Sequence, residues 1–417
     1  LGTIRAVAEE IGALAFDSVV TTELFEILLA GALATRASDI HLEAQEKEAR
    51  VRFRVDGVLH DVYSALPLKN YESLTTRVKL LSGLKINVRT EPQDGRFTVA
   101  LTKKEVEMRV SVIPSEFGET VVMRILDPDA IAISLSELGL RPDDLAIVED
   151  ILKRPNGLVL NTGPTGSGKT TTLYAFLRSV ANPEVKVITI EDPIEYHLAG
   201  VEQTQTDRDA NYTFASGLRS ILRQDPDVIL VGEIRDKETA EIAMQAALTG
   251  HLVFSTLHTN DAVGAIPRLA DLEVKTTTIG PALTLVIAQR LVRRLCAKCK
   301  KKAAIPPELA KRIEAFLKKL PARVLRAPYR TATLFEAAGC AACSGVGYKG
   351  RVGIFEFFRV DAKVQEAIVG SVSRGTLDAL AGEQGMVSMQ EDGVLKALSG
   401  VTTLEEVERA TGPVQWQ

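Results

Sequence analysis

Gly157-Leu-Val-Leu-Asn161-Thr-Gly163-Pro-Thr-Gly-Ser-Gly-Lys169-Thr170 is the stretch that decides the fold of this 417-residue chain. An apolar strand runs into an eight-residue glycine-rich loop, and a helix is expected to begin near Lys169. The glycines let backbone N–H groups point at a β-phosphate, Lys169 neutralises β/γ oxygens, and the Thr170 hydroxyl can ligate Mg²⁺. The sequence therefore predicts a site for ATP and Mg²⁺. Its expected nucleotide-binding residues are Gly163, Pro164, Thr165, Gly166, Ser167, Gly168, Lys169, Thr170 and Thr171.

Further short strands that are apolar throughout surround this loop in the sequence, at 158–160, 185–190, 228–231 and 252–254. Strands that are apolar on both faces, separated by helical stretches, are typical of a parallel sheet covered by helices. Ligands of such sheets bind at the carboxyl ends of the strands.

Acidic residues follow two of these strands. Glu233 lies at the carboxyl end of the strand 228–231, after Gly232, so we expect it to be the catalytic base. The alternative is a solvated acid without a catalytic role. Gly232 occupies the place where many P-loop enzymes carry Asp, which argues against direct Mg²⁺ ligation from this strand. Glu191 and Asp192 end the strand before it, and either could support the metal and the attacking water.

A third strand end carries His258, which we assign to coupling or phosphate sensing. A lone His in a loop is more often a structural hydrogen-bonding residue, and that alternative stays open. Arg219, Arg223 and Arg235 flank the Glu233 strand, where they could serve sensing or interface roles.

Before the glycine-rich loop, the pattern predicts a small α/β unit. Helical spacing covers 22–37 and 71–84, and strand-like stretches lie at 40–43, 51–55, 96–101, 106–112 and 120–126. A linking helix is expected over 142–153, opened by Pro142 and the acids after it. After Arg290 the chain becomes basic and cysteine-bearing, with a helical insert at 307–320 and short helices in the last sixty or so residues.

Bulk composition indicates a globular protein of several domains. The formal net charge is −4 and only 5% of residues are aromatic, which argues against a nucleic-acid partner. The longest apolar runs, 27–34 and 279–288, are too short for a membrane helix. Because the N-terminus starts Leu-Gly-Thr without Met, we expect an upstream domain to be missing.

Four cysteines form two CxxC pairs, Cys296 with Cys299 and Cys340 with Cys343. Two such pairs complete a tetrahedral Zn²⁺ site with no open position, so the predicted metal site is structural. Incidental buried cysteines are the alternative.

Taken together, these motifs resemble the secretion ATPases that power type II secretion and type IV pilus assembly, the GspE/PilB group. The resemblance covers nearly the whole chain and rests on the P-loop, Glu191-Asp192 and the His258 segment together with three further strings. These are Arg36-Ala-Ser-Asp-Ile-His41, Pro92-Gln-Asp-Gly-Arg96, and Leu218-Arg-Ser-Ile-Leu-Arg-Gln-Asp-Pro-Asp227 running into Gly232-Glu233.

The resemblance implies a PAS-like α/β domain followed by a RecA-like P-loop ATPase domain, a four-cysteine zinc knuckle and a C-terminal helical region. The implied ranges are a linker at 1–20, domains at 21–130 and 152–290 joined by 131–151, the zinc subdomain at 291–357 and the helices at 358–417. It also implies that Arg96, Arg109 and Arg124 reach the nucleotide phosphates, although each could instead be a surface charge.

The function implied is that of a homohexameric cytoplasmic ATPase at the inner membrane. Its expected partners are a platform protein of that membrane and a cytoplasmic adaptor. The rival interpretations are a nucleic-acid translocase or DNA-uptake motor, a pilus retraction motor, and a nucleotide switch that does not hydrolyse ATP. The family's assembly ATPases carry the long-spaced cysteine pairs and its retraction ATPases lack them, so the cysteines favour assembly.

Overall fold

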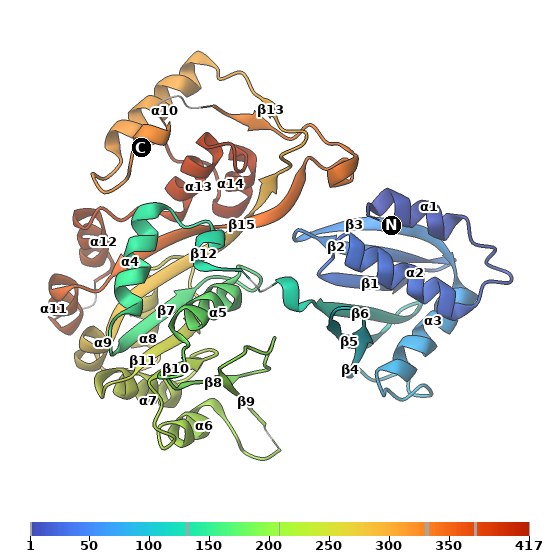
Figure 1. Ribbon diagram of the computed structural model, residues 1–417, viewed down its shortest axis with the longest axis horizontal. Helices are drawn as coiled ribbons and strands as arrows, with labels where there is room; N and C mark the ends of the chain where they lie inside the picture. The colour runs from blue at the N-terminus through green and yellow to red at the C-terminus, as the bar shows by residue number, and fades with distance from the viewer. Residues whose placement is uncertain (1, 131–132, 208, 330–332, 371–372, 417) are drawn as a thin grey trace. The chain divides into compact units, whose positions relative to one another are not determined.

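The computed structural model describes residues 2–130, 133–207, 209–329, 333–370 and 373–416. They form two compact units (Figure 1). Unit 1 comprises Leu1–Ala130, Leu295–Lys301 and Ala337–Gly350, and unit 2 comprises Ile131–Arg294, Lys302–Glu336 and Arg351–Gln417. The cysteine-bearing segments therefore belong to the same unit as the N-terminal part of the chain.

Unit 1 is built on a six-stranded antiparallel sheet in the order β3-β2-β1-β6-β5-β4. The strands are β1 (Asp39–Ala44), β2 (Glu48–Val55), β3 (Val58–Pro67), β4 (Gln93–Ala100), β5 (Glu105–Ser115) and β6 (Gly118–Leu126). Burial alternates along β5, where Val106, Met108 and Val110 are buried and the residues between them are not. One face of the sheet is therefore a core face and the other carries polar side chains.

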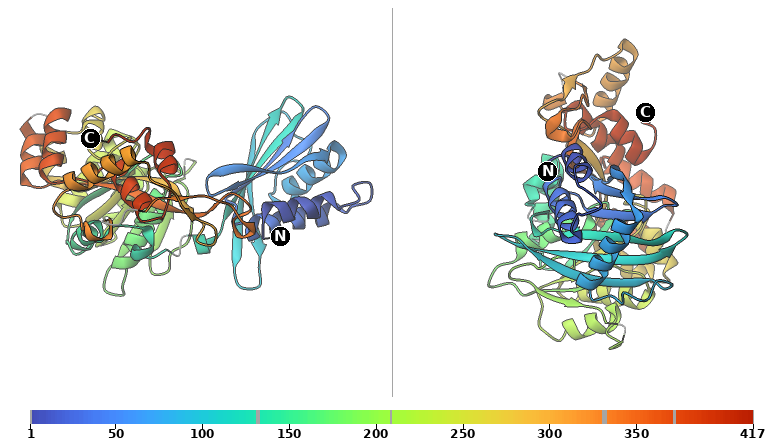
Figure 2. Two further views of the ribbon diagram at one scale, coloured as in Figure 1. Left: turned by 90° about the horizontal axis from the view of Figure 1, so that it is seen from above. Right: turned by 90° about the vertical axis from the view of Figure 1, so that its right-hand side faces the viewer.

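Three helices pack on the core face: α1 (Ile4–Gly12), α2 (Thr21–Ala34) and α3 (Leu68–Leu81) (Figures 1 and 2). Leu24 and Leu28 of α2 and Leu74 and Val78 of α3 join one apolar cluster with the strands. The predicted small α/β unit is confirmed, with β3 as a strand that the sequence analysis did not predict.

Unit 2 contains a seven-stranded sheet in the order β15-β12-β7-β11-β10-β8-β9. The strands are β7 (Gly157–Thr162), β8 (Val187–Glu191), β9 (Glu202–Gln205), β10 (Val228–Val231), β11 (Leu252–Leu257), β12 (Leu283–Leu295) and β15 (Tyr348–Arg359). The pairs from β12 through β9 are parallel, and all residues of β7, β8, β10 and β11 are buried. This confirms the predicted parallel sheet.

Helices cover both faces of this sheet, as the views in Figures 1 and 2 show. Helices α4 (Pro142–Leu152) and α5 (Lys169–Val180) share one apolar cluster with the sheet. The opposite cluster takes residues from α6 (Phe214–Ile221), α7 (Lys237–Leu248), α8 (Ala265–Asp271), α9 (Thr276–Ala282), α11 (Ala362–Gly370) and α12 (Arg374–Glu383).

A separate apolar cluster joins α10 (Pro307–Lys319), α13 (Met389–Leu398) and α14 (Leu404–Thr411). The buried carboxylate of Asp392 on α13 ties this group to the rest of unit 2. Its Oδ1 accepts from Arg141 Nη1, just before α4, at 2.7 Å, and its Oδ2 accepts from the backbone N–H of Phe355 on β15 at 2.9 Å. Short elements complete the fold: β13 (Lys301–Lys302), β14 (Phe335–Glu336), and the 3₁₀ turns η1 (Pro128–Ala130), η2 (Leu135–Leu138), η3 (Ala327–Tyr329) and η4 (Ala341–Cys343).

Three strands of this sheet, β9, β12 and β15, are not among the strands that the sequence predicts. The apolar run 279–288, too short for a membrane helix, forms the end of α9 and the first half of β12. Among the described residues, no helix combines the length and the apolar character needed to cross a bilayer.

Candidate active site

The glycine-rich loop lies between the end of β7 and the start of α5, as predicted. Gly163 has φ 148° and Gly168 has φ 90°, and both lie against β12. A Cβ on Gly163 would come within 2.4 Å of the carbonyl oxygen of Gln289, and one on Gly168 within 2.8 Å of Gln289 Nε2. Backbone angle and space therefore both require glycine here.

The loop has the features of a phosphate cradle. Helix α5 carries no acid in its first turn, so its N–H groups and dipole are free to attract an anion. Thr170 is exposed at the start of the helix, where its hydroxyl could ligate Mg²⁺. Ser167 Oγ is buried and has no hydrogen-bond partner among the described residues. A bound phosphate would give that buried hydroxyl a partner.

Lys169 lies across this cradle: its Nζ donates to the carbonyl oxygens of Gly163 at 2.7 Å and Pro164 at 3.1 Å. Burial lowers the pKa of Lys169, and the nearby Glu233 carboxylate opposes that shift. A half-buried cation whose hydrogen-bond partners among the described residues are backbone carbonyls can turn to an incoming anion.

Gln289 on β12 lies against the glycine-rich loop. The sequence analysis did not predict a role for it. Its Oε1 accepts hydrogen bonds from Asn161 Nδ2 at 3.0 Å and from Thr172 Oγ1 at 2.8 Å, so it joins the strand before the loop to the helix after it. Gln289 is 2% exposed. A signal existed, since Gln289 is the polar residue that ends the apolar run of β12.

Glu233 lies just beyond the end of β10, with Gly232 between them. A Cβ on Gly232 would lie 3.3 Å from the backbone of both Ile190 and Glu191, so β10 and β8 approach closely at this point. The Glu233 carboxylate pairs with Arg235 Nη2 at 2.5 Å and lies 3.6 Å from His258 Nε2. Its side chain is 14% exposed.

His258 follows β11, the next strand of the sheet, and faces Glu233. Burial and the positive charge of Lys169 lower the pKa of His258, although Glu233 opposes the shift. The structure therefore brings Lys169, Glu233 and His258 together at the carboxyl edge of the sheet.

Glu191 ends β8 but its carboxylate is occupied within the protein. It accepts hydrogen bonds from Tyr174 Oη, from Thr189 Oγ1 at 2.6 Å and from Gln203 Nε2 at 3.2 Å, and the residue is 4% exposed. Asp192, the next residue, is exposed and acts electrostatically on Arg235. Of the two acids, Asp192 is thus the one whose charge acts on the Glu233–Arg235 pair.

The three arginines predicted to reach a nucleotide lie in one row of unit 1. Strand pairing places Arg96 opposite Arg109, and Arg109 opposite Arg124. Arg124 Nε donates to Asp39 Oδ1 at 3.1 Å, and Arg109 Nε lies 3.5 Å from Glu107 Oε1. The row lies on the polar face of the sheet, opposite the helices.

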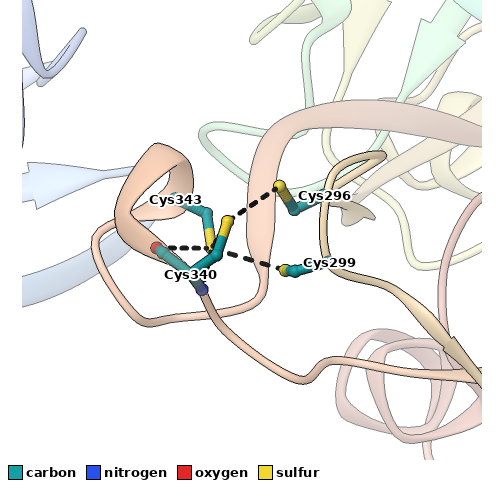
Figure 3. A group of neighbouring side chains, drawn as sticks. All are labelled: Cys296, Cys299, Cys340 and Cys343. Atoms are coloured by element: carbon teal, nitrogen blue, oxygen red, sulfur yellow. Dashed lines mark hydrogen bonds between the residues drawn. The ribbon is translucent and has the colours of Figure 1, made fainter.

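The four cysteines gather as predicted (Figure 3), with their sulfur atoms within 4.8 Å of one another. Neighbouring sulfurs are 3.7 to 3.9 Å apart. Tetrahedral Zn–S bonds of about 2.3 Å require sulfurs about 3.8 Å apart, so the donor set fits zinc. Burial raises the pKa of Cys343, but N–H groups of Cys340 and Gly347 and the thiols of Cys299 and Cys340 together lower that pKa to about 7. Burial and the neighbouring thiols raise the pKa of Cys299.

A parallel sheet with a phosphate cradle after β7, and with an acid and a histidine at the ends of the next two strands, defines a P-loop ATPase. The family model for type II/IV secretion system proteins matches residues 15–409, and the chain belongs to that family.

Named relatives agree with this assignment. The type IV pilus assembly ATPase PilB of Myxococcus xanthus is 44% identical over 400 residues, covering 96% of this chain and 69% of that protein. The type II secretion system protein E of Pseudomonas aeruginosa is 45% identical over 396 residues, covering 95% and 76%. The chain is thus an ATPase of the secretion and pilus group.

Solved structures show the same fold. The pilus retraction motor PilT with bound ADP matches at a TM-score of 0.59 and 25% identity, over 92% of this chain and 95% of that one. The ATPase DotB of Legionella pneumophila matches at a TM-score of 0.68 over 94% and 96%, and at 21% identity it supports the fold alone.

Proposed function

We propose that this chain is a homohexameric motor that drives assembly of a type II secretion pseudopilus or a type IV pilus at the cytoplasmic face of the inner membrane. The observation that carries the proposal is identity of 44 to 45% with a pilus assembly ATPase and a type II secretion protein over 95 to 96% of the chain. Its partners would be a platform protein of that membrane and a cytoplasmic adaptor.

Within this proposal the residues of unit 2 divide the chemistry. The loop Gly163–Thr170, with Thr171 after it, binds the ATP phosphates, and Lys169 turns from its carbonyl partners to the β/γ oxygens. Thr170 would hold Mg²⁺, which when bound would supply positive charge to the phosphates. Glu233 takes the proton of the attacking water, Arg235 and His258 fix its carboxylate, and Asp192 or Glu191 supports the placement of metal and water.

The arginine row of unit 1, Arg96, Arg109 and Arg124, would couple ATP hydrolysis to movement. Arg96, Arg109 and Arg124 lie side by side on adjacent strands, and Arg109 and Arg124 would exchange their partners Glu107 and Asp39 for a triphosphate. If these side chains reach nucleotide held by unit 2, ATP binding and product release would move unit 1 against unit 2.

The cysteine cluster is proposed to hold one structural Zn²⁺. The cysteines approach from two segments of unit 1, Leu295–Lys301 and Ala337–Gly350, so one ion would join them (Figure 3). Its four thiolates would leave no open position for catalysis. Since the family's retraction motors lack such pairs, the cluster favours assembly over retraction.

The test is an allele in the source organism that carries Glu233→Gln, with Glu308→Gln on the exposed face of α10 as the matched control. We expect Glu233→Gln to abolish surface pili or secreted protein at normal levels of the ATPase, whereas Glu308→Gln leaves both unchanged. Normal pili and normal secretion in the Glu233→Gln strain would contradict the proposal. If DNA uptake alone is lost, and DNA stimulates hydrolysis with steep salt dependence, the chain is a nucleic-acid motor instead.

A further inference from the structure

The segment 258–264, which joins β11 to α8 and is called the β11–α8 loop below, contacts the hydrolysis site at its first end. The backbone N–H of Thr259 donates to Thr162 Oγ1 at 2.7 Å, and the two hydroxyls lie 2.8 Å apart. Thr162 is the residue directly before the P-loop, and His258 faces Glu233. A displacement of this loop would therefore move His258 relative to the carboxylate.

Its other end is held by the C-terminal part of unit 2. The backbone N–H of Ala262 donates to Glu356 Oε1 at 2.8 Å. Asp261 accepts hydrogen bonds from Arg374 Nη1 of α12 at 3.0 and 3.2 Å, and Asp261 Oδ1 also accepts from the Gly264 N–H at 2.7 Å. The loop thus connects the active site to β15 and α12.

Glu356 also reaches a third element. Its second oxygen, Oε2, accepts from the backbone N–H of Met389 at 3.4 Å, and Met389 is the first residue of α13. The positive end of that helix favours a carboxylate. One carboxyl group therefore bridges the β11–α8 loop and the N-terminus of α13, and at 5% exposure it does so away from water.

Packing alone does not explain this carboxyl. Ala262 and Val263 are buried in the large apolar cluster of unit 2, so the loop is already anchored by apolar contacts. Among the described residues no cation forms an ion pair with Glu356. Two N–H groups offset only part of the free energy that burying a carboxyl costs. An acceptor is needed here for the N–H groups of Ala262 and Met389, but a neutral amide would provide one without burying an ionisable group.

We propose that Glu356, together with Arg374, is a positioning residue for ATP hydrolysis: it fixes the β11–α8 loop so that His258 stays beside Glu233, and it transmits the loop's position to α12 and α13. This inference rests on the proposed roles of Glu233 and His258. It adds a route by which the nucleotide state reaches the C-terminal helices.

Two variants and a control test it by kinetics. Glu356→Gln keeps one oxygen for the Ala262 N–H and replaces the acceptor for Met389 with an NH₂ group. Arg374→Gln removes the surface pair with Asp261, and Asp378→Asn removes the other partner of Arg374 without touching the loop. We expect kcat to fall about 10-fold or more in both Gln variants. KM for ATP and affinity for a fluorescent ADP should stay within about two-fold, because the P-loop is intact.

Transmission is tested by hydrogen exchange of the full chain with and without ADP and Mg²⁺. In the wild type, nucleotide should change exchange in both 258–264 and 389–392. In Glu356→Gln only the first segment should respond, a separation that a merely structural role would not produce.

The inference is overturned if both Gln variants, folded by thermal melting, keep wild-type kcat, or if KM rises in step with the loss of kcat. Should Glu356→Gln fail to fold, Arg374→Gln, a change at an exposed pair, decides the question alone. If Glu233→Gln hydrolyses ATP normally, the proposed function itself fails. A normal Glu356→Gln beside an inactive Glu233→Gln defeats only this inference.

Discussion

Lys169 and Glu233 lie close enough to interact electrostatically. Replacing each should nevertheless affect a different step, nucleotide binding or hydrolysis. Lys169→Ala removes the cation of the P-loop, so we expect nucleotide binding or turnover to be lost. Glu233→Gln should still bind ATP while turnover falls about 10²- to 10⁴-fold, the usual cost of losing a well-placed base. Binding of a fluorescent ATP analogue and single-turnover hydrolysis separate the two effects. Turnover of Glu233→Gln within a few-fold of wild type would remove Glu233 from its assigned role.

The protonation of His258 gives a pH prediction at the same scale. Burial and the Lys169 charge lower its pKa below the ordinary 6.5, so the neutral imidazole should predominate at pH 7. If the neutral ring is the active form, kcat should hold down to pH 6.5 and decline only in more acid solution. His258→Gln, measured over the same range, should lack that decline. An unchanged pH profile in the variant would show that another group causes it.

At the scale of single elements, β15 buries a titratable side chain, Glu356, that the sequence analysis did not predict to be buried. Burial raises the pKa of the Glu356 carboxyl to about 7 from an ordinary 4.5, although N–H groups of Ala262 and Met389 oppose the shift. The unfolded chain releases this proton near pH 4.5 and the folded chain holds it to about pH 7. The stability that Glu356 contributes is therefore greatest below pH 4.5 and is lost as pH rises to 7.

Glu356→Gln cannot ionise, so its stability relative to the wild type should increase from pH 5 to pH 8. Thermal midpoints of both proteins at pH 5, 6, 7 and 8 measure this difference, in which other titrating groups cancel. A difference that is constant with pH would show that Glu356 does not titrate in this window. If Glu356→Gln is at least as stable as the wild type at pH 8 but has a lower kcat, the carboxyl serves hydrolysis and not stability.

The cysteine-bearing turns are the second element to test. Backbone hydrogen bonds, such as Cys296 N–H to the Gly347 carbonyl at 2.9 Å, hold the two segments together. Among the described residues, the apolar clusters include no residue of either segment. Metal binding to a site absent from the unfolded chain is itself folding free energy. Replacing Cys340 and Cys343 by Ser should lower the thermal midpoint and increase hydrogen exchange in both segments, while nucleotide binding by the P-loop persists.

Elemental analysis of metal-replete wild-type protein checks the same site directly. We expect one zinc per chain and thiols that do not react in the native state. No zinc, with all four thiols freely titratable, would exclude the proposed centre.

For the whole molecule, the decisive property is assembly. If the arginine row of unit 1 acts on nucleotide within a ring, specific ATPase activity should fall on dilution, as the ring dissociates. Activity measured over a concentration series, with light scattering for the mass, tests this. Arg109→Gln should reduce kcat, whereas Arg5→Gln, an exposed residue of α1, should not. Undiminished hydrolysis by a strictly monomeric preparation would contradict both the ring and the arginine roles.

Much of the site could be predicted because it depends on local sequence. The P-loop pattern specifies its own backbone geometry, and a buried parallel strand places the residue after it at the ligand edge, which located both Glu233 and His258. The fold class followed from the same apolar strands. Two CxxC pairs likewise predicted a cluster of four sulfurs, which the structure forms.

Tertiary structure alone decided the rest, because those features depend on residues far apart in the chain. The apolar run in β12 could be strand or helix until it paired with β7, and only that pairing placed Gln289 under the P-loop. The sequence predicts Glu191 only as an acid at a strand end. In the structure, β8 packs against α5, and the Glu191 carboxylate accepts a hydrogen bond from Tyr174 Oη. Glu356 contacts the β11–α8 loop across a separation of 94 residues, for which no local pattern exists. Sequence thus determined which groups stand at each strand end, and packing determined what each one faces.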